Sequence, residues 1–218
     1  MSQVENMRQM VATKLNGIER YNPENLVLLE QYVEMQVREN TYDLEANLAI
    51  LKLYQLDPTK YNLDIVCLIL MKAVTNFPHT DLTLCKCLLS DRNMQDTQVS
   101  NIVFLADILE RCDFQQFWTK VNSMPDLCSR ISGFNDSIRK FVCHVVGITF
   151  QTISKPLLAR LLGDIDDNSL VMWIRKNNWK EVENNMVLIA NQDDNIKTKN
   201  ITEKINFTDV SAIMASCR

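Results

Sequence analysis

Length, composition and charge already narrow the class of protein. The chain has 218 residues, 46% of them apolar, which is enough for one substantial hydrophobic core or two modest ones and indicates a globular fold. Its net charge is −4 and its isoelectric point about 5.3, whereas domains that mainly neutralise phosphates are usually strongly basic. Nucleic-acid binding is therefore not expected to be its main task.

The chain shows no signal for secretion or membrane insertion. Residues 1–10 lack the apolar segment of a signal peptide, and the seven cysteines are an odd number that fall mostly in helical patterns. The longest aliphatic run, Ile65–Met71, is far shorter than the roughly 20 residues that cross a bilayer. We expect a reducing, cytoplasmic environment, with a nuclear pool left open.

Residues 22–56 predict two antiparallel helices. Asn22 and Pro23 form an N-cap followed by proline at the first helical position, and apolar residues then recur every three or four positions. The same pattern returns from Leu44 and ends at Asp57-Pro58, because proline disfavours helix at the residue before it.

Four more helices are predicted between residues 62 and 122. Asn62 is expected to cap the first, which ends near Phe77-Pro78, and Thr80-Asp81 opens the second. The polar stretch Ser90–Gln98 then separates this pair from two helices joined near Cys112-Asp113. Short connections between amphipathic helices favour stacked hairpins, so residues 1–130 are predicted to form a helical-repeat domain that is HEAT- or tetratricopeptide-like in shape only.

The pattern changes near Gly133. A helix is expected from about Asn135 to Phe150, followed by a brief strand at Gln151–Ile153, a helix that Ser154 caps, and a short helix around Leu170–Ile174. Two strand-like runs then flank Asn184-Asn185, a pair that tolerates the positive φ angles of a type I′ hairpin. This order of elements is that of a winged helix, and we assign residues 131–207 to such a module and residues 208–218 to a C-terminal helix.

A winged helix raises the alternative of nucleic-acid binding. Its third helix offers Arg175 and Lys176, but Asp164, Asp166 and Asp167 precede it and would repel a phosphate backbone. Sequence-specific DNA binding is therefore disfavoured, while weak contact with ribosomal RNA through scattered basic residues stays open, namely Lys155, Arg160, Lys197 and Lys199.

No constellation of residues predicts catalysis, a cofactor or a metal. Cys85 and Cys87 have neither the usual structural-zinc spacing nor a second Cys/His pair nearby in sequence. Cys143 and His144 are adjacent, so on a helix their side chains point about 100° apart and a thiol–base pair is not expected. The four glycines are isolated, which leaves no phosphate-cradling loop.

Several long motifs resemble the k-subunit family of eukaryotic translation initiation factor three, and the resemblance covers essentially the whole chain. It departs mainly at residues 91–98 and around the hairpin turn. The motifs are Tyr21-Asn-Pro-Glu-Asn-Leu26, Tyr42-Asp-Leu-Glu-Ala-Asn-Leu-Ala49, Leu51-Lys-Leu-Tyr54, Pro78-His-Thr-Asp81, Thr83-Leu-Cys-Lys-Cys87, Arg139-Lys-Phe-Val-Cys-His-Val-Val-Gly-Ile-Thr149 and Val210-Ser-Ala-Ile-Met-Ala-Ser216.

The resemblance implies a non-catalytic scaffold subunit. Such subunits are related to the PCI subunits of the proteasome lid and the COP9 signalosome, and they line up through their winged helices. The implied partners are other subunits of initiation factor three, especially subunit l, and through the complex the 40S ribosomal subunit. A subunit of a related PCI assembly is the alternative that the resemblance leaves open.

The docking surface is expected on the hairpin and the C-terminal helix. The uncharged strand Met186–Ile189, with Met186, Val187, Leu188 and Ile189, is expected to have an open edge that another strand or helix covers, with Trp179 beside it. The C-terminal helix is too short to be stable alone and must dock, either on its own module, which we favour, or in a bundle with partner subunits. Its apolar residues are Phe207, Val210, Ile213 and Met214.

Overall fold

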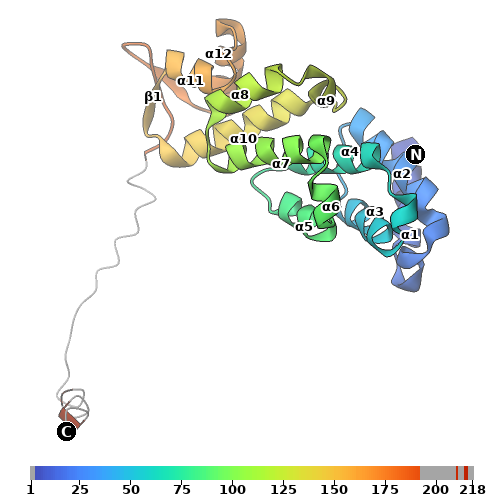
Figure 1. Cartoon of the computed structure of the whole chain (residues 1–218). Coiled ribbons are helices and arrows are strands. Elements are labelled where there is room, and N and C mark those ends of the chain that lie inside the picture. Colours follow the sequence, from blue (N-terminus) through green and yellow to red (C-terminus); the bar gives the residue numbers. More distant parts are fainter. Residues whose placement is uncertain (1–2, 192–209, 211–213, 216–218) are drawn as a thin grey trace.

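The computed structural model describes residues 3–191, 210 and 214–215, and this part of the chain is mainly helical with one small antiparallel sheet (Figure 1). The first half is a series of helices joined by short turns, three of them 3₁₀ turns (η). Its elements are α1 (Gln3–Lys14), η1 (Gly17–Tyr21), η2 (Pro23–Asn25), α2 (Leu26–Arg38), α3 (Leu44–Leu56), η3 (Pro58–Lys60), α4 (Leu63–Val74) and α5 (Asp81–Leu88).

Side-chain caps fix where these helices begin. The Asn22 side chain accepts a hydrogen bond from the Glu24 amide at 3.0 Å, and Asn62 accepts one from Asp64 at 3.1 Å, as the sequence predicts. Asn22 first opens the 3₁₀ turn η2, and α2 follows from Leu26. Asp43 caps α3 by accepting from the Ala46 amide at 3.1 Å, which the sequence analysis did not single out.

Helix α4 is the centre of the repeat. Every residue from Ile65 to Val74 is buried, because α2 and α5 pack on α4 together with α7 (Thr97–Glu110). A helix that is apolar on all sides needs such cover from all directions. The described buried residues form one continuous hydrophobic cluster, from Val11 in α1 to Ile189 after the sheet.

Three helices were not predicted from the sequence. Helix α1 buries Val11 against the rest of the repeat, and Leu15 directly after the helix is buried as well, although the apolar stripe of α1 is narrow. The other two are single turns, α6 (Asp91–Met94) and α9 (Pro125–Ser129), within stretches that read as polar connections. Their brevity explains why periodicity could not reveal them.

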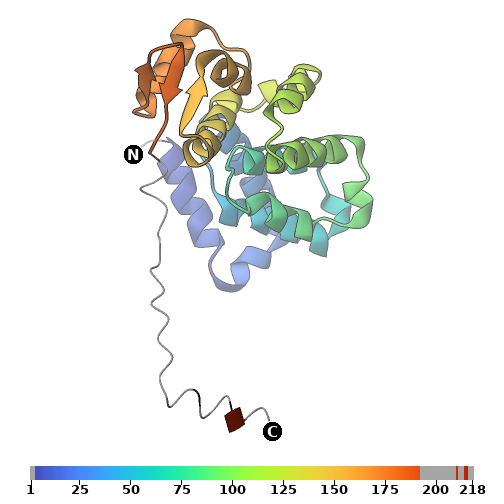
Figure 2. The same ribbon diagram turned by 90° about the vertical axis from the view of Figure 1, so that its left-hand side faces the viewer.

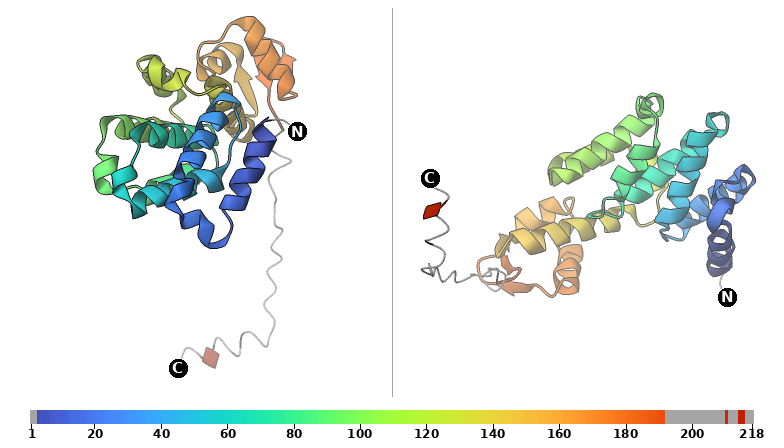
Figure 3. Two further views of the ribbon diagram at one scale, coloured as in Figure 1. Left: turned by 90° about the vertical axis from the view of Figure 1, so that its right-hand side faces the viewer. Right: turned by 90° about the horizontal axis from the view of Figure 1, so that it is seen from below.

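The second half is built around the long helix α10 (Phe134–Thr149), which lies beside α8 (Phe114–Asn122) and continues into the sheet (Figure 3). Two rings pack on its Phe141 side chain: Phe77 from the turn after α4 lies 5.3 Å away between ring centroids, and Phe114 of α8 lies 6.1 Å away. Helix α10 therefore belongs to the core of both parts. The predicted boundary between residues 130 and 131 stays a prediction.

The elements after α10 follow the winged-helix order, and the predicted fold class is confirmed. Figure 2 shows the sheet against its helices at the end of the molecule opposite to the α3–α6 layers. The elements are β1 (Thr152–Ser154), α11 (Lys155–Leu161), α12 (Asp167–Lys176), β2 (Lys180–Val182) and β3 (Met186–Leu188).

The predicted C-terminal helix is only partly described. Val210, Met214 and Ala215 have helical backbone, and the Val210 and Met214 side chains are exposed, by 37% and 69%. Phe207 and Ile213 lie outside the described residues. The place where this segment packs therefore stays a prediction.

Candidate partner interface

The sheet has the strand order β1-β3-β2, with both pairs antiparallel. The hairpin turn has Asn184 and Asn185 at φ 63° and 60°, as a type I′ turn needs. Val182 pairs with Met186, so Glu183 belongs to the loop as well. The Lys155 amide donates to the Asn185 carbonyl at 3.0 Å, which anchors the turn to the start of α11.

The expected open edge on Met186–Ile189 is wrong. Strand β3 is the central strand: Ile153 of β1 pairs with Val187 on one side, and Glu181 of β2 pairs with it on the other. The Ile189 amide extends the pairing by donating to the Gln151 carbonyl at 2.9 Å. Within the described residues, free strand edges are left to β1 and β2 instead. Strand β2 is exposed along its whole length.

The two faces of the sheet differ. Residues paired across antiparallel strands point to the same face, so Ile153 and Val187 share the inner face, where they are exposed by only 2% and 0%. The opposite face carries three apolar side chains in one cluster: Val182 is exposed by 49%, and its partner Met186 and the neighbouring Leu188 are half-buried. We call Val182, Met186 and Leu188 the outer sheet face.

The predicted interface residues on the hairpin thus divide into two groups. Met186 and Leu188 lie on the outer sheet face, whereas Val187 and Ile189 are core residues. Trp179 precedes β2, is half-buried and packs against the core, with its amide donating to the Ile174 carbonyl at 3.0 Å. Val182 was not predicted, because the pattern of Trp179–Glu183 does not show which strand lies at the edge.

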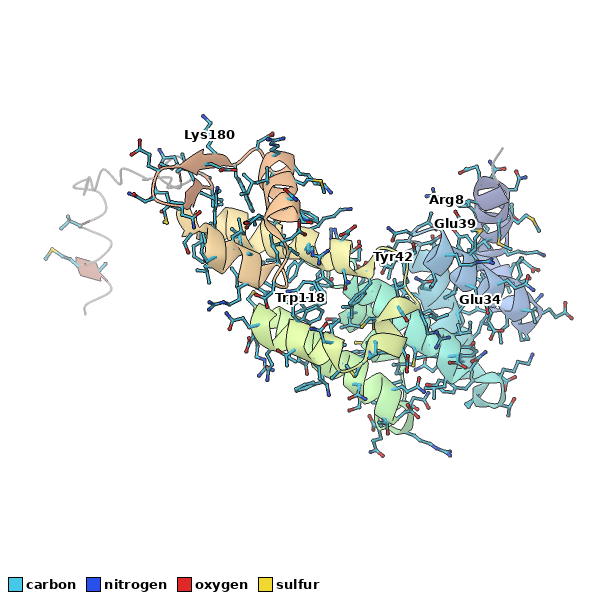
Figure 4. All side chains as sticks on the ribbon, turned by 90° about the horizontal axis from the view of Figure 1, so that it is seen from above. Arg8, Glu34, Glu39, Tyr42, Trp118 and Lys180 are labelled. Atoms are coloured by element: carbon cyan, nitrogen blue, oxygen red, sulfur yellow. The ribbon has the colours of Figure 1, made fainter. Side chains whose placement is uncertain are left out.

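A junction between α8 and the α11–α12 loop holds the module on the repeat. The indole of Trp118 donates to the Leu161 carbonyl at 2.9 Å, and the Arg139 guanidinium donates to the Leu162 carbonyl at 3.1 Å while lying 5.6 Å above the Trp118 ring. Gly163 follows with φ 92° against the same ring. Figure 4 shows Trp118 at this point, between the repeat and the module. The sheet therefore has a defined position on the helical domain.

The charges of the module do not suit a reading helix for DNA. The N-terminal turn of α12, which would face the bases, contains Asp167 and is capped by the Asp166 carboxylate, which accepts from the Ser169 amide at 3.2 Å. At the other end, the Lys176 ammonium lies 4.5 Å above the Trp173 ring. Lys180 of β2 extends away from the helices (Figure 4). The arrangement presents basic groups singly rather than as a phosphate-binding stripe.

The cysteine candidates do not form reactive sites. Burial raises the pKa of the Cys143 thiol to about 11, while the adjacent His144 is exposed on another side of α10. Cys85 is buried with its pKa raised to about 12, and Cys87 is exposed. Within the residues that the structure describes, there is no group of three or more His, Cys, Asp or Glu side chains placed to hold a metal ion. None of the described helices is both long and apolar enough to span a membrane.

Comparison with known proteins agrees with this architecture. The model of the CSN8/PSMD8/EIF3K family matches residues 60–200, which include the second half of the predicted repeat and the whole of the three-stranded sheet with its helices. A relative from Bombyx mori, eukaryotic translation initiation factor 3 subunit K, is 64% identical over 97% of this chain and 96% of its own length. Proteins of the same name from Aedes aegypti and Mus musculus are 60% and 52% identical, over 93% and 99% of this chain and 91% and 99% of their own lengths.

Both comparisons bear on the resemblance seen in the sequence motifs. The family model covers more than half of the chain, and the relatives align with it almost from end to end. The chain therefore belongs to the CSN8/PSMD8/EIF3K family, among the K subunits of eukaryotic translation initiation factor 3.

Proposed function

We propose that this chain is a scaffold subunit that docks through the outer sheet face and the β2 edge onto subunit l of initiation factor 3 and helps to assemble the factor on the 40S ribosomal subunit. Its membership of the factor, and with it a non-catalytic role in translation initiation, follows from the family. That membership also implies the cytoplasm.

The outer sheet face carries the proposal. Val182, Met186 and Leu188 lie on the side of the sheet that faces away from the core. They adjoin β2, whose backbone groups pair on one side only among the residues that the structure describes. Covering a side chain of this kind stabilises a complex by roughly 1 kcal/mol or more. A partner strand or helix would at the same time cover the unpaired backbone donors and acceptors along the outer edge of β2.

The sheet alone is smaller than a stable interface. Specific interfaces bury about 800 Å² on each partner, more than one face of three three-residue strands offers. We propose that the C-terminal segment, with Val210 and Met214 exposed, provides further contact area in a bundle with partner helices. Packing of the segment on its own module, which the sequence analysis favours, is the competing prediction that the truncation below also tests.

The test is the molar mass of the purified chain mixed with purified subunit l, measured by light scattering on a sizing column. A stable one-to-one complex is expected. Val182→Lys and Met186→Lys place charges on the outer sheet face and are expected to weaken the complex at least roughly tenfold each, because a buried unpaired ammonium costs more than the lost contact. Removal of residues 208–218 is expected to weaken it further.

The control is Met172→Lys, which replaces another exposed apolar side chain, 67% exposed, that belongs to the helix α12 and not to the sheet. It is expected to leave the complex unchanged. Equal affinity of the two sheet variants and the control, with all chains folded, would exclude the outer sheet face as the docking surface. Val187 and Ile189 are unsuitable for this test, because a charge at either position would unfold the core.

The alternative functions make different predictions. A subunit of a related PCI assembly would bind lid or signalosome partners instead, but the near full-length identity to K subunits favours initiation factor 3. A nucleic-acid-binding winged helix would show steeply salt-dependent binding of duplex by the isolated chain, which the charges of α12 disfavour.

A further inference from the structure

A pocket of about 470 Å³ lies in the helical repeat, between α3, the turn after it and the α5–α6 connection. These elements lie side by side away from the sheet (Figures 1 and 2), so the pocket is independent of the outer sheet face. Its floor is apolar: Leu51 and Tyr54 are core residues, while Leu88 and Leu89 are half-buried at its side.

One wall contains a hydroxyl without a partner. The Tyr61 side-chain oxygen is inaccessible to water and has no hydrogen bond within the described residues. Its neighbour Tyr54, 5.6 Å away between ring centroids, already donates its own hydroxyl to Glu30. Burial, with smaller effects of Cys67 and Asp96, raises the pKa of Tyr61 to about 12. An unpaired buried hydroxyl destabilises the protein, but because water does not reach this oxygen, it offers no hydrogen bond to a group bound in the pocket.

The rim of the pocket adds a cation. The Arg92 side chain of α6 is exposed and forms no ion pair or hydrogen bond within the described part of the chain. The other charged wall residue, Asp96, already accepts a hydrogen bond from the Gln98 amide at 2.9 Å as the cap of α7. Among the described residues, Arg92 is thus an unpaired cation in a region of net negative charge, since residues 1–127 contain 11 Lys and Arg and 17 Asp and Glu. Its five donors suit a carboxylate.

We propose that this pocket binds a short acidic segment of a partner protein, with one large apolar side chain on the floor between Tyr54 and Leu88 and a neighbouring carboxylate on Arg92. Its volume of about 470 Å³ accommodates an aromatic side chain together with adjoining peptide backbone. Anchoring by one buried side chain with a charged contact at the rim is how helical-repeat surfaces bind extended segments. The pocket remains open to such a segment while the sheet is docked.

The probe is the peptide acetyl-Gly-Glu-Phe-Glu-Gly-amide, titrated into the full ¹⁵N-labelled chain while the backbone amide resonances are followed. Shifts are expected at residues 54–61 and 88–96, with a Kd on the order of 1 mM or below. Two matched peptides, with Lys in place of both Glu residues or Ser in place of Phe, are expected to bind roughly tenfold more weakly. Shifts outside the pocket only, or equal binding of the Glu and Lys peptides, would overturn the proposal.

Variants test the carboxylate contact of Arg92 separately from the wall that contains Tyr61. Arg92→Glu is expected to lose roughly tenfold in affinity for the Glu peptide and to prefer the Lys peptide, while Arg160→Glu on α11, also exposed, leaves binding unchanged. Tyr61→Phe is expected to raise the unfolding temperature of the free chain, because it removes the unpaired hydroxyl, and to leave binding of the Glu peptide unchanged, because the hydroxyl does not reach the ligand. Unchanged binding of the Glu peptide by Arg92→Glu contradicts the proposed site.

Discussion

At the scale of single residues, the buried polar groups of the repeat differ in how well they are paired. Gln36 and Asn47 join α2 to α3: the Gln36 amide donates to the Asn47 side-chain oxygen at 3.0 Å, and the Asp43 backbone amide donates to Gln36 at 2.8 Å. Lys72 is different. It is 2% exposed, and its ammonium has one contact, 3.4 Å from the Asn40 side-chain oxygen. No carboxylate pairs with it within the described residues.

Lys72→Met is therefore expected to stabilise the protein. Burial lowers the pKa of Lys72 to about 8 from its ordinary 10.5. Keeping the ammonium charged in the native state therefore costs free energy that the unfolded state, where the group is hydrated, does not lose. Below pH 8 the cost amounts to about 3 kcal/mol, and between pH 8 and 10.5 it disappears, because there the unfolded chain binds more protons than the native one. The gain from Lys72→Met should be full at pH 7 and small above pH 10.

The measurement is the free energy of unfolding of both proteins by denaturant titration at pH 7, 8.5 and 10. Taking the difference between variant and parent cancels the titration of the buried tyrosines and cysteines, which the two proteins share. Lys52→Met on α3, where the lysine is half-buried and bonded to Gln55 at 2.8 Å, serves as the control and should show no such dependence. A gain that is the same at all three pH values would exclude the buried charge as its cause.

The sequence could predict capping residues but not this lysine. Asn22 and Asn62 precede helical patterns and act locally, so their roles can be seen without knowing the fold. Lys72 is the one charged residue in the buried run of α4. In a helical sequence pattern, a charged residue usually indicates the solvent-exposed face of the helix. Its surroundings depend on residues far away in the sequence, such as Asn40, 32 positions earlier.

At the scale of elements, the hairpin turn could be predicted from two adjacent residues, whereas the pairing of its strands could not. The Asn184-Asn185 pair correctly predicted a turn with two positive φ angles, since asparagine tolerates that region better than other residues with a side chain. The pairing of β3 with β1 was missed, because Ile153 and Val187 are far apart in sequence and a three-residue strand has no periodicity to match. The wrong open edge follows directly from that omission.

The turn can be tested by paired substitutions at Asn185. Asn185→Gly is expected to stabilise the hairpin by about 0.5 kcal/mol, because glycine has no Cβ to clash at φ 60°, whereas Asn185→Ala should destabilise it by about 1 kcal/mol. Thermal unfolding measures both. The carbonyl of residue 185 still accepts from Lys155 in each variant, so the anchoring to α11 is held constant. Equal stabilities of the two variants would show that the turn conformation does not limit this hairpin.

At the scale of the whole molecule, the function proposed for the sheet depends on its fixed position relative to the repeat. Helix α10 belongs to the core of both parts, and the hydrogen bonds from Trp118 and Arg139 to the Leu161 and Leu162 carbonyls tie the module to the repeat. The sequence predicted this helix, from about Asn135 to Phe150. It could not predict that Gly163 faces Trp118, a contact between residues 45 positions apart.

Gly163→Ala is expected to loosen this junction. A Cβ at position 163 would lie 2.9 Å from Cδ2 of the Trp118 ring, and φ 92° is itself unfavourable for alanine, so we expect a loss of about 2–4 kcal/mol in the free energy of unfolding. Gly17→Ala is the matched control: its φ is 59°, nothing lies within 4 Å of the added Cβ, and only the backbone cost of about 1 kcal/mol should appear.

A second substitution identifies the ring as the source of the difference. Trp118→Leu removes the atoms that the added Cβ would strike, so Gly163→Ala should cost no more than the Gly17 control in that background, a coupling of about 1–3 kcal/mol between the two positions. Additive losses would mean that the backbone angle alone requires glycine. If the two positions are coupled, Gly163→Ala in the chain that keeps Trp118 should also bind subunit l more weakly than its loss of stability accounts for. The reason is that the sheet would then lie at a changed angle to the repeat.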